Sequence, residues 1–467
     1  METLELAPAS PATVASSGER YKAILRLALP TVFAMLAQSV VNDIDLLFFK
    51  HLPLPDASYA QAALLPALIL TWAFGGSLSA ISVGTQALVA RRYAEGKRMA
   101  AGAVLGNAVF FCVGAGALLS ILGFLLLPML VRSMVEVPEV QEVAIAYTRW
   151  RLLAVISMSA TMAIKSFFDG IGKTWVHLVA SILMNVCNVA LCWVLIFGHL
   201  GMPAMGASGA GCAAFLATWV GLGVMVVYAW AAREDYHPMR FVNVSAKTIW
   251  ALLKLSVPAA AATLVMMVGF GLFAHTVGLL DQRSAGEPIN EAANTDIIET
   301  LKLTFVACMS FGTAAATLIG QALGRKDPEE AQRWGWASVR LGILVFGVVG
   351  LFEGVLFTHP IVGFIASSAR VGHAMVFPLR AMGVATPLIA VAMILSEGLF
   401  GAGNTRFVAV AQAVLIFGWL VPGAYLLGIV MHMGLNGVWI AAFIYACLAA
   451  ATMSTKFAGG TWKRIRL

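Results

Sequence analysis

Charged residues are scarce in this sequence. Among 467 residues, 11% are charged and 60% are apolar, whereas a typical soluble domain carries about 25% charged residues. Such a composition excludes an ordinary soluble protein, a disordered chain and an extended charged binding surface. It is typical of a polytopic membrane protein, and the predicted fold class is all-α.

Long polar segments are also few. A membrane-spanning helix needs about 20 mainly apolar residues, and the sequence contains twelve such runs. We expect spans at 24–50, 60–90, 101–131, 141–168, 174–198, 208–231, 248–280, 292–323, 335–358, 372–402, 406–430 and 434–457. Outside these spans remain a cytoplasmic tail at 1–23, a cytoplasmic linker at 232–247 and a basic cytoplasmic end at 458–467. The tail is rich in Ala, Pro, Ser and Thr and lacks the charge-then-apolar order of a secretory signal, so we expect it to be disordered.

The formal charge of +7 follows membrane topology rather than a nucleic-acid surface. Lys and Arg gather in alternate connections, such as ARRYAEGKR at 90–98 and the terminal WKRIRL, while the opposite set holds only Lys50, Arg132, Arg283 and Arg370. The positive-inside rule then places both termini in the cytoplasm. We expect a multi-pass protein of the inner cell membrane that contacts the lipid bilayer and no nucleic acid.

Groupings typical of metal sites, disulfides and enzymes are missing. All six cysteines fall inside predicted spans, and the eight histidines are scattered without metal-ligand spacing. GIGKT at 170–174 resembles the end of a phosphate-binding loop, but Phe167 stands where the first glycine is required. We therefore expect no catalytic residues, no metal site, no cofactor and no enzyme activity.

An internal repeat divides the chain. Four anchors recur in the same order: RLALPTVF at 26–33 with LKLSVPAAA at 253–261, GTQALVARRY at 84–93 with IGQALGRKD at 319–327, FFDGIGKT at 167–174 with GLFGAGNT at 398–405, and MGASGAG at 205–211 with MGLNGVW at 433–439. Their offsets are nearly constant, 228 residues between Pro30 and Pro258 and 231 between Thr174 and Thr405. Six spans separate equivalent positions, so the halves 24–231 and 248–457 are predicted to be parallel and related by a pseudo-twofold axis.

Two arginines extend this repeat. Arg149 precedes Thr174 by 25 residues, and Arg380 precedes Thr405 by 25. Two interpretations remain open: both arginines brace their halves from inside, or both extend to the outer membrane interface.

The ordered set of twelve spans, two G-x-G-x-T turns and GQALG resembles the multidrug and toxic compound extrusion (MATE) family. The segment LCWVLIFGHLGMPAMGASGAG and the closing FAGGTWKRIRL add to the resemblance. It implies an N-lobe and a C-lobe of six helices each around a central cavity. It also implies antiport of small organic, often cationic, compounds against protons or sodium ions, and we expect a monomer.

The resemblance places an ion-coupling aspartate of the first helix at Asp45, supported by Asn188. The acid that some relatives place one turn after Asn188 reads as Cys192, and a supporting threonine reads as Ala214. Because these changes remove oxygen ligands that a hard cation prefers, protons are predicted over sodium. In the C-lobe, Met266 and Ile389 stand where some members have acids. Possible substitutes are Glu299, more simply explained as an ion pair with Lys302 at i+3, and Glu397, more simply explained as a solvated helix-end charge.

Helix geometry separates the two aspartates of VVNDIDLLFF. Positions 43 and 45 are about 200° apart on a helix, so they face different neighbours. Asp45 shares a polar stripe with Asn42 and Gln38, whereas Asp43 lies nearer Leu36 and Leu47. We assign Asp45 to the central cavity as the ion-coupling acid. Asp43 is expected to contact a neighbouring helix, either protonated or paired, and is kept as a possible secondary acid.

Aromatic and sulfur-containing side chains are the expected walls for hydrophobic cations. The candidates for the substrate cavity are Trp72, Met266, Met267, Phe270, Phe273 and Phe305. The main rival function is a flippase of lipid-linked sugars, which needs a cationic cavity; the few central cations are Lys302, Arg149, Arg151 and Arg380.

Overall fold

The twelve predicted spans are present as helices in the computed structural model. It describes residues 16–236, 244–283, 288–465 and 467, without the side chains of 39–43, Ser77, Arg233, Glu234 and Arg283. This described part is helical and contains no strand. Within it, eleven helices are long and apolar enough to cross a membrane, and the 33-residue α1 is a twelfth long helix.

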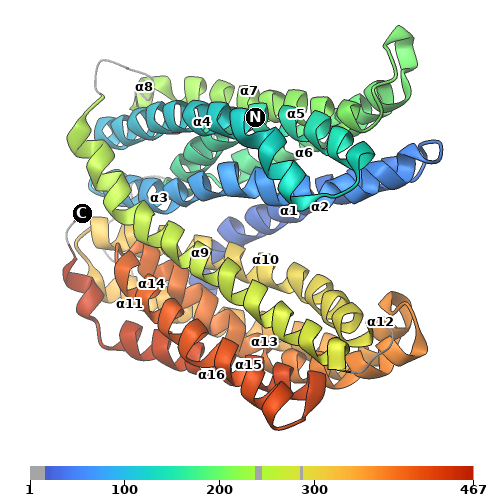
Figure 1. Cartoon of the computed structure of the whole chain (residues 1–467). Helices are drawn as coiled ribbons and strands as arrows, with labels where there is room; N and C mark the ends of the chain where they lie inside the picture. The colour runs from blue at the N-terminus through green and yellow to red at the C-terminus, as the bar shows by residue number, and fades with distance from the viewer. Residues whose placement is uncertain (1–15, 237–243, 284–287, 466) are drawn as a thin grey trace.

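The first six spans form the N-lobe, drawn in blue to green in Figure 1. Its helices are α1 (Ser17–Phe49), α2 (Asp56–Gly75) continued through η1 (Gly76–Ala80) into α3 (Ile81–Ala94), α4 (Arg98–Met134), α5 (Pro138–Gly170), α6 (Trp175–Phe197), the short η2 (His199–Gly201), α7 (Gly206–Ala231) and the short α8 (Arg233–Tyr236).

The last six spans form the C-lobe, drawn in yellow to red. Its helices are α9 (Ala246–Arg283), α10 (Ile289–Gly324), α11 (Pro328–Leu351) with η4 (Phe352–Leu356) and α12 (Thr358–Ile365), α13 (Ala369–Gly401), α14 (Thr405–Leu415) with η5 (Ile416–Leu420), α15 (Val421–Tyr425) and η6 (Leu426–Val430), α16 (Gly434–Ala458) and η7 (Thr461–Arg464). The predicted linker at 232–247 includes 237–243, which lie outside the described residues.

The repeated G-x-G-x-T motif makes the same turn in each lobe. Gly172, between α5 and α6, has φ +81°, and Gly403, between α13 and α14, has φ +87°. Only glycine adopts this left-handed conformation without steric cost. GIGKT is therefore a turn between two helices, as the comparison with GAGNT predicts.

The ends of the chain differ from expectation in one respect. α1 begins at Ser17, because Ser16 and Glu19 form a reciprocal capping box, so residues 17–23 are helical rather than part of a tail. At the other end, the Trp462 side chain is fully buried and stacks on Phe457 with ring centroids 4.6 Å apart. The basic C-terminal segment is thus packed against the C-lobe.

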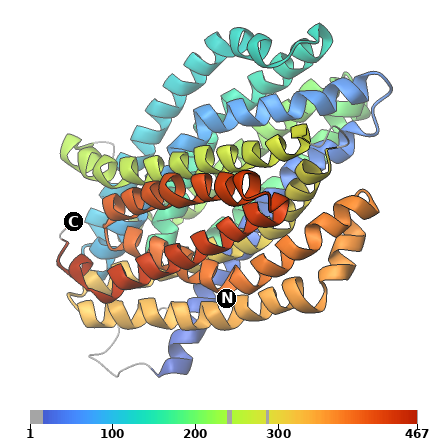
Figure 2. The same cartoon turned by 60° about the horizontal axis from the view of Figure 1, so that its bottom comes forward.

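Helix α1 connects the two lobes. Its first half packs Ile24, Leu27 and Ala28 into a core shared with α10 and α11 of the C-lobe. Its last half lies against α6 and α2 of the N-lobe, where Phe49 is buried. Figure 2 shows this dark blue helix starting beside α11 and continuing towards the N-lobe. Pro30, which removes one backbone hydrogen bond, lies between the two halves.

Candidate functional site

The Asp45 carboxylate is enclosed within the N-lobe. Its residue has no exposed surface, and it lies on the last turns of α1 where that helix packs against α6. The Tyr147 hydroxyl of α5 donates a hydrogen bond of 2.7 Å to Oδ2, and the Cys192 thiol of α6 lies 3.8 Å from Oδ1. Three helices therefore meet at one acid, and each carboxylate oxygen has a partner.

Two further residues complete this cluster. Asn188, one turn before Cys192, is 1% exposed; its Oδ1 lies 3.9 Å from the Cys192 sulfur, and its Nδ2 has no hydrogen-bond partner. Arg151 on α5 interacts electrostatically with Asp45, and its guanidinium lies 5.8 Å from the Tyr147 ring centroid. The cluster thus combines a buried acid, a nearby cation and an unsatisfied amide inside the N-lobe.

The predicted ion-coupling residues are only partly brought together. Asp45 and Asn188 join one cluster through Cys192. Gln38 is half-buried two turns earlier on α1, and the side chains of Asn42 and Asp43 lie outside the described part of the chain. Nearby, the Asn185 amide donates 2.7 Å to the Ala37 carbonyl and fixes α6 against α1.

The sequence analysis did not identify Tyr147 as a site residue and treated Arg151 only as a possible flippase cation. Both occur in AYTRWR (146–151), one helical turn apart. The i, i+4 spacing of a tyrosine and an arginine on a span was the available signal, because such residues share one face. Arg149 gave the stronger sequence signal, because the repeat has Arg380 at the equivalent position.

Arg149 and Arg380 are both exposed. The Arg149 guanidinium lies 5.6 Å from the Phe124 ring centroid, and Arg380 Nη2 lies 3.2 Å from Nε2 of His359. Of the two interpretations, the surface one fits these positions, and an internal brace does not. The arginine inside the N-lobe is Arg151, half-buried two residues later.

In the C-lobe, the two positions that hold acids in some relatives are apolar here. Met266 is half-buried and Ile389 is 7% exposed. Glu299 forms a 2.7 Å ion pair with Lys302, with both side chains largely exposed. The sequence analysis missed Glu353, on the π-helical η4, whose Oε1 accepts a hydrogen bond of 2.9 Å from Thr304.

The predicted cavity residues divide into two groups. Trp72, Met267 and Phe270 are between 41% and 48% exposed, while Met266 and Phe305 are half-buried. Phe273 does not fit the prediction: it is 2% exposed and packs edge-on against Trp439, with ring centroids 5.5 Å apart, inside the C-lobe core.

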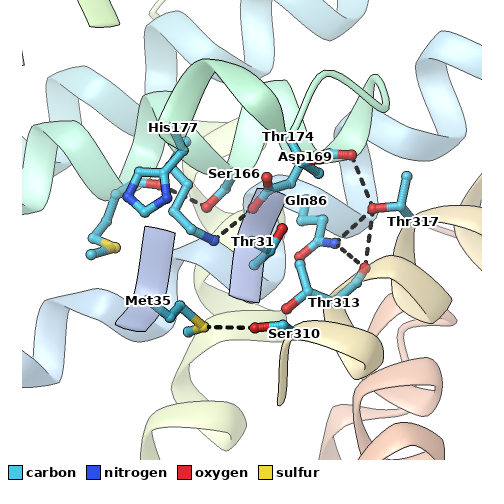
Figure 3. A network of polar contacts seen from close by, with 12 residues as sticks. Thr31, Met35, Gln86, Ser166, Asp169, Thr174, His177, Ser310, Thr313 and Thr317 are labelled. Atoms are coloured by element: carbon cyan, nitrogen blue, oxygen red, sulfur yellow. Dashed lines mark hydrogen bonds and ion pairs between the residues drawn. The ribbon is translucent and has the colours of Figure 1, made fainter. Parts of the chain in front are cut away.

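The lobes are tied together near the ends of α3 and α10 by a polar network (Figure 3). The Gln86 amide of α3 donates 2.9 Å bonds to the Thr313 carbonyl and the Thr317 hydroxyl of α10. Thr317 in turn donates 2.9 Å to the backbone carbonyl of Asp169 at the end of α5. The first-half anchor GTQALVARRY thus lies at the boundary between the lobes.

Equivalent glutamines of the two halves donate hydrogen bonds across this boundary in opposite directions. Gln321, the counterpart of Gln86, donates 2.9 Å to the Gly170 carbonyl of the first glycine turn. Arg91 of α3 donates 2.9 Å to the Ala402 carbonyl of the second glycine turn and 2.7 Å to the Ile465 carbonyl of the C-terminal segment. A Cβ added at Gly324 would lie 2.5 Å from the Arg91 carbonyl oxygen. The two lobes are therefore in close contact here.

Buried charges lie beside this network. Lys165 and Asp169 on α5 form a 2.6 Å ion pair with 9% and 1% of their side chains exposed. Glu397 on α13 interacts electrostatically with Lys165 across the boundary, and its Cγ would lie 2.6 Å from a Cβ added at Gly312. Glu397 is thus half-buried between the lobes rather than a solvated helix end.

Comparison with known proteins shows which family this chain belongs to. The MatE family model matches residues 30–194 and 292–426. The probable multidrug resistance protein NorM of Thermotoga maritima is 24% identical over 95% of this chain and 93% of its own. The multidrug resistance protein NorM of Vibrio vulnificus is 26% identical over 93% and 95%.

A solved structure described as the outward-facing conformation of a multidrug resistance MATE family transporter of the MOP superfamily has the same fold. Its TM-score is 0.83 at 21% identity, over 94% of this chain and 96% of that one. The match of the family model across both lobes, together with the twelve-helix fold, identifies the chain as a member of the MatE family of membrane transporters.

Proposed function

We propose that this protein is a secondary active antiporter that exports small organic compounds, cationic or amphipathic, across the inner cell membrane in exchange for protons. It works as a monomer, because one chain supplies both lobes. Both termini lie in the cytoplasm, because Lys and Arg gather in the connections on that side. The names of the NorM relatives support multidrug efflux. The observation that carries the choice of ion is the enclosure of Asp45.

The partners of Asp45 favour a proton. One oxygen accepts from a tyrosine hydroxyl at 2.7 Å and the other faces a thiol at 3.8 Å. A hard cation is bound by several oxygen ligands, whereas sulfur is a soft ligand. Cys192 occupies a place where an additional oxygen would be needed. Sodium is the second candidate, because the Asn188 amide and water could provide ligands.

Proton binding and substrate binding exclude each other at such a site. Burial favours the neutral acid, while a nearby organic cation favours the carboxylate. A proton arriving from outside neutralises Asp45 and weakens its interactions with Tyr147 and Arg151. The N-lobe then loses a buried negative charge that attracts a cation, and the substrate is released.

Helix α1 links this event to the lobe boundary. Asp45 lies at its outer end, and the opposite half packs on α10 and α11. In that half the Leu27 carbonyl accepts a 3.0 Å bond from Thr174 of the N-lobe. Closer to Asp45, Met35 Sδ lies 3.3 Å from Ser310 Oγ of the C-lobe. A change in α1 at Asp45 therefore acts on groups of both lobes.

The boundary itself acts as the cytoplasmic gate. The bonds of Gln86, Gln321 and Arg91 across the lobes must break before substrate enters from the cytoplasm.

The energy for export comes from the proton. Each charge moved through about 100 mV supplies roughly 2.3 kcal/mol, and each tenfold proton gradient about 1.4 kcal/mol. For a compound without net charge, one proton thus supports export against a gradient of a few hundredfold. Exchange of one proton for a monovalent cation moves no net charge, so there only the proton gradient contributes, about tenfold for each tenfold difference.

A lipid-linked sugar flippase is less well supported. A pyrophosphate group needs several cations around one cavity. Arg149 and Arg380 are exposed, Lys302 pairs with Glu299, and Arg151 interacts with Asp45. Among the described residues these four cations do not converge.

The test is transport by purified protein in liposomes. A panel of fluorescent organic cations is offered under an imposed proton gradient, and separately under a sodium gradient at constant pH. Efflux driven by the proton gradient in the absence of sodium supports the proposal. Efflux that needs sodium and persists without a proton gradient would show that sodium, and not the proton, is the coupling ion. If no organic cation of the panel is transported, organic cations are not the substrates.

A further inference from the structure

A basic pocket opens between the first turns of α1 and α11, away from the Asp45 site. Its volume is about 200 Å³, and its lining includes Arg20 and Tyr21 of α1 with Glu329, Arg333, Trp336 and Arg340 of α11. Three arginines thus face one pocket that also holds two aromatic rings. The single acid of the lining, Glu329, forms a 2.7 Å ion pair with Lys463.

The arginines are available for a ligand. Arg333 and Arg340 are exposed, and neither forms an ion pair or hydrogen bond with other described residues. Arg20 lies with its guanidinium 5.8 Å from the Trp334 ring centroid, and its Nε is buried without a hydrogen-bond partner. The first turns of two helices add positive partial charge. The chemistry of the pocket suits a phosphate group, which arginine binds through paired hydrogen bonds.

The surface above the pocket suits hydrocarbon. Arg340 is seven residues after Arg333, and Leu344 and Leu351 follow at 11 and 18 residues, so all four lie within about 20° of one helical stripe. Leu344 is 64% exposed and Leu351 48%. One face of α11 therefore carries arginines in its first half and at its middle, and exposed leucines beyond them. This order matches that of a phospholipid in the cytoplasmic leaflet, with the headgroup outside and the acyl chain towards the membrane interior.

We propose that this pocket binds the phosphate headgroup of an anionic phospholipid of the cytoplasmic leaflet, with an acyl chain along Leu344 and Leu351. The site joins the lobes, because Arg20 lies on α1 and Arg333 and Arg340 lie on α11. A bound headgroup stabilises the contact of α1 with the C-lobe. The site is independent of the transported ion and of the substrate.

Native mass spectrometry of the purified protein tests the proposal. Apparent affinity is measured for dioleoyl phosphatidylglycerol and for dioleoyl phosphatidylcholine. Arg333→Gln combined with Arg340→Gln removes two pocket cations, and Lys22→Gln combined with Arg26→Gln removes two exposed cations of α1 outside the pocket. At about fivefold per basic residue near a membrane surface, the pocket variant is expected to bind phosphatidylglycerol roughly twentyfold more weakly. The control variant is expected to lose less than a quarter of that factor.

A third variant acts in the opposite direction and cannot be mistaken for misfolding. Glu329→Gln removes the one acid of the lining and frees Lys463, so phosphatidylglycerol should bind about fivefold more tightly. Equal losses in the pocket and control variants would overturn the proposal in favour of general surface charge. Inorganic phosphate that displaces the lipid at millimolar concentration would make the site one for free phosphate and would likewise overturn it.

Discussion

The two lobes share one scaffold and differ in what fills it. Counting by the repeat offsets, Asp45 of α1 corresponds to Phe273 of α9, Tyr147 to Pro378 and Arg151 to Met382. The three C-lobe residues are all buried, and Phe273 packs on Trp439 where the N-lobe has a hydrogen-bonded acid. One half holds a polar cluster and the other an apolar core in the equivalent place.

Other features have stayed alike in both lobes. Each retains a left-handed glycine in its G-x-G-x-T turn, and each sends a glutamine across the boundary to the opposite lobe. The shared features form turns and contacts between the lobes. The differing position holds a carboxylic acid, Asp45, in the N-lobe and the apolar Phe273 in the C-lobe. We therefore expect that both lobes take part in the conformational change and that the N-lobe alone supplies the coupling acid.

The largest expected effect is the loss of coupling in Asp45→Asn. Asparagine keeps the size and still accepts the Tyr147 bond, but it cannot release a proton. Efflux driven by a proton gradient should fall to the level of liposomes without protein. Transport is measured per amount of folded protein, with the melting temperature as the control; an active and well-folded variant would show that the N-lobe cluster is not the coupling site.

The equivalent change in the C-lobe should act on stability instead. Phe273→Ala removes a buried ring and leaves a cavity, a change that typically costs about 3 kcal/mol. The proton dependence of whatever protein remains folded should be unaltered. Thermal unfolding in detergent and transport at several pH values check the two parts, and a changed proton dependence with normal stability would break the comparison.

A smaller effect is expected from Tyr147→Phe, which removes the 2.7 Å bond to Asp45. Hydrogen bonds to charged groups contribute about 1.5 kcal/mol or more, and this one favours the carboxylate over the neutral acid. Without it the carboxylate form of Asp45 loses its hydrogen-bond donor, so half-maximal efflux should move to higher pH. A pH profile of initial rates in liposomes measures the shift, and a fall in that pH would contradict the assignment.

The sequence sufficed for the spans and for the duplication, because hydrophobic run length and constant offsets do not depend on tertiary packing. Asp45 and Asn188 could be paired only through the family resemblance. Tyr147 and Arg151 were missed as partners of Asp45, since the direction in which α5 faces α1 is set by packing between helices. For the same reason Phe273 was misplaced: an aromatic residue on a span has the same sequence signal whether it faces a cavity, lipid or a core.

The smallest effect is expected at Glu353, and it tests the comparison from the C-lobe side. Glu353 is a half-buried acid of the C-lobe, with Oε1 bonded to Thr304 and Oε2 buried without a partner. Glu353→Gln keeps an oxygen that accepts from Thr304, so it preserves the contact while removing the ability to exchange a proton. If coupling belongs to the N-lobe alone, proton-driven efflux should stay within about twofold of that of the unmodified protein. The glutamine keeps the hydrogen bond from Thr304, which contributes about 1 kcal/mol, so the fold should be little affected. Glu299→Gln, which changes an exposed ion pair worth well under about 1 kcal/mol, is the matched control for loss of a C-lobe acid. Glu353→Gln could instead lose as much efflux as Asp45→Asn while Glu299→Gln stays active. That result would mean that both lobes carry a coupling carboxylate, and that the C-lobe acid lies on a different helix from Phe273, the counterpart of Asp45.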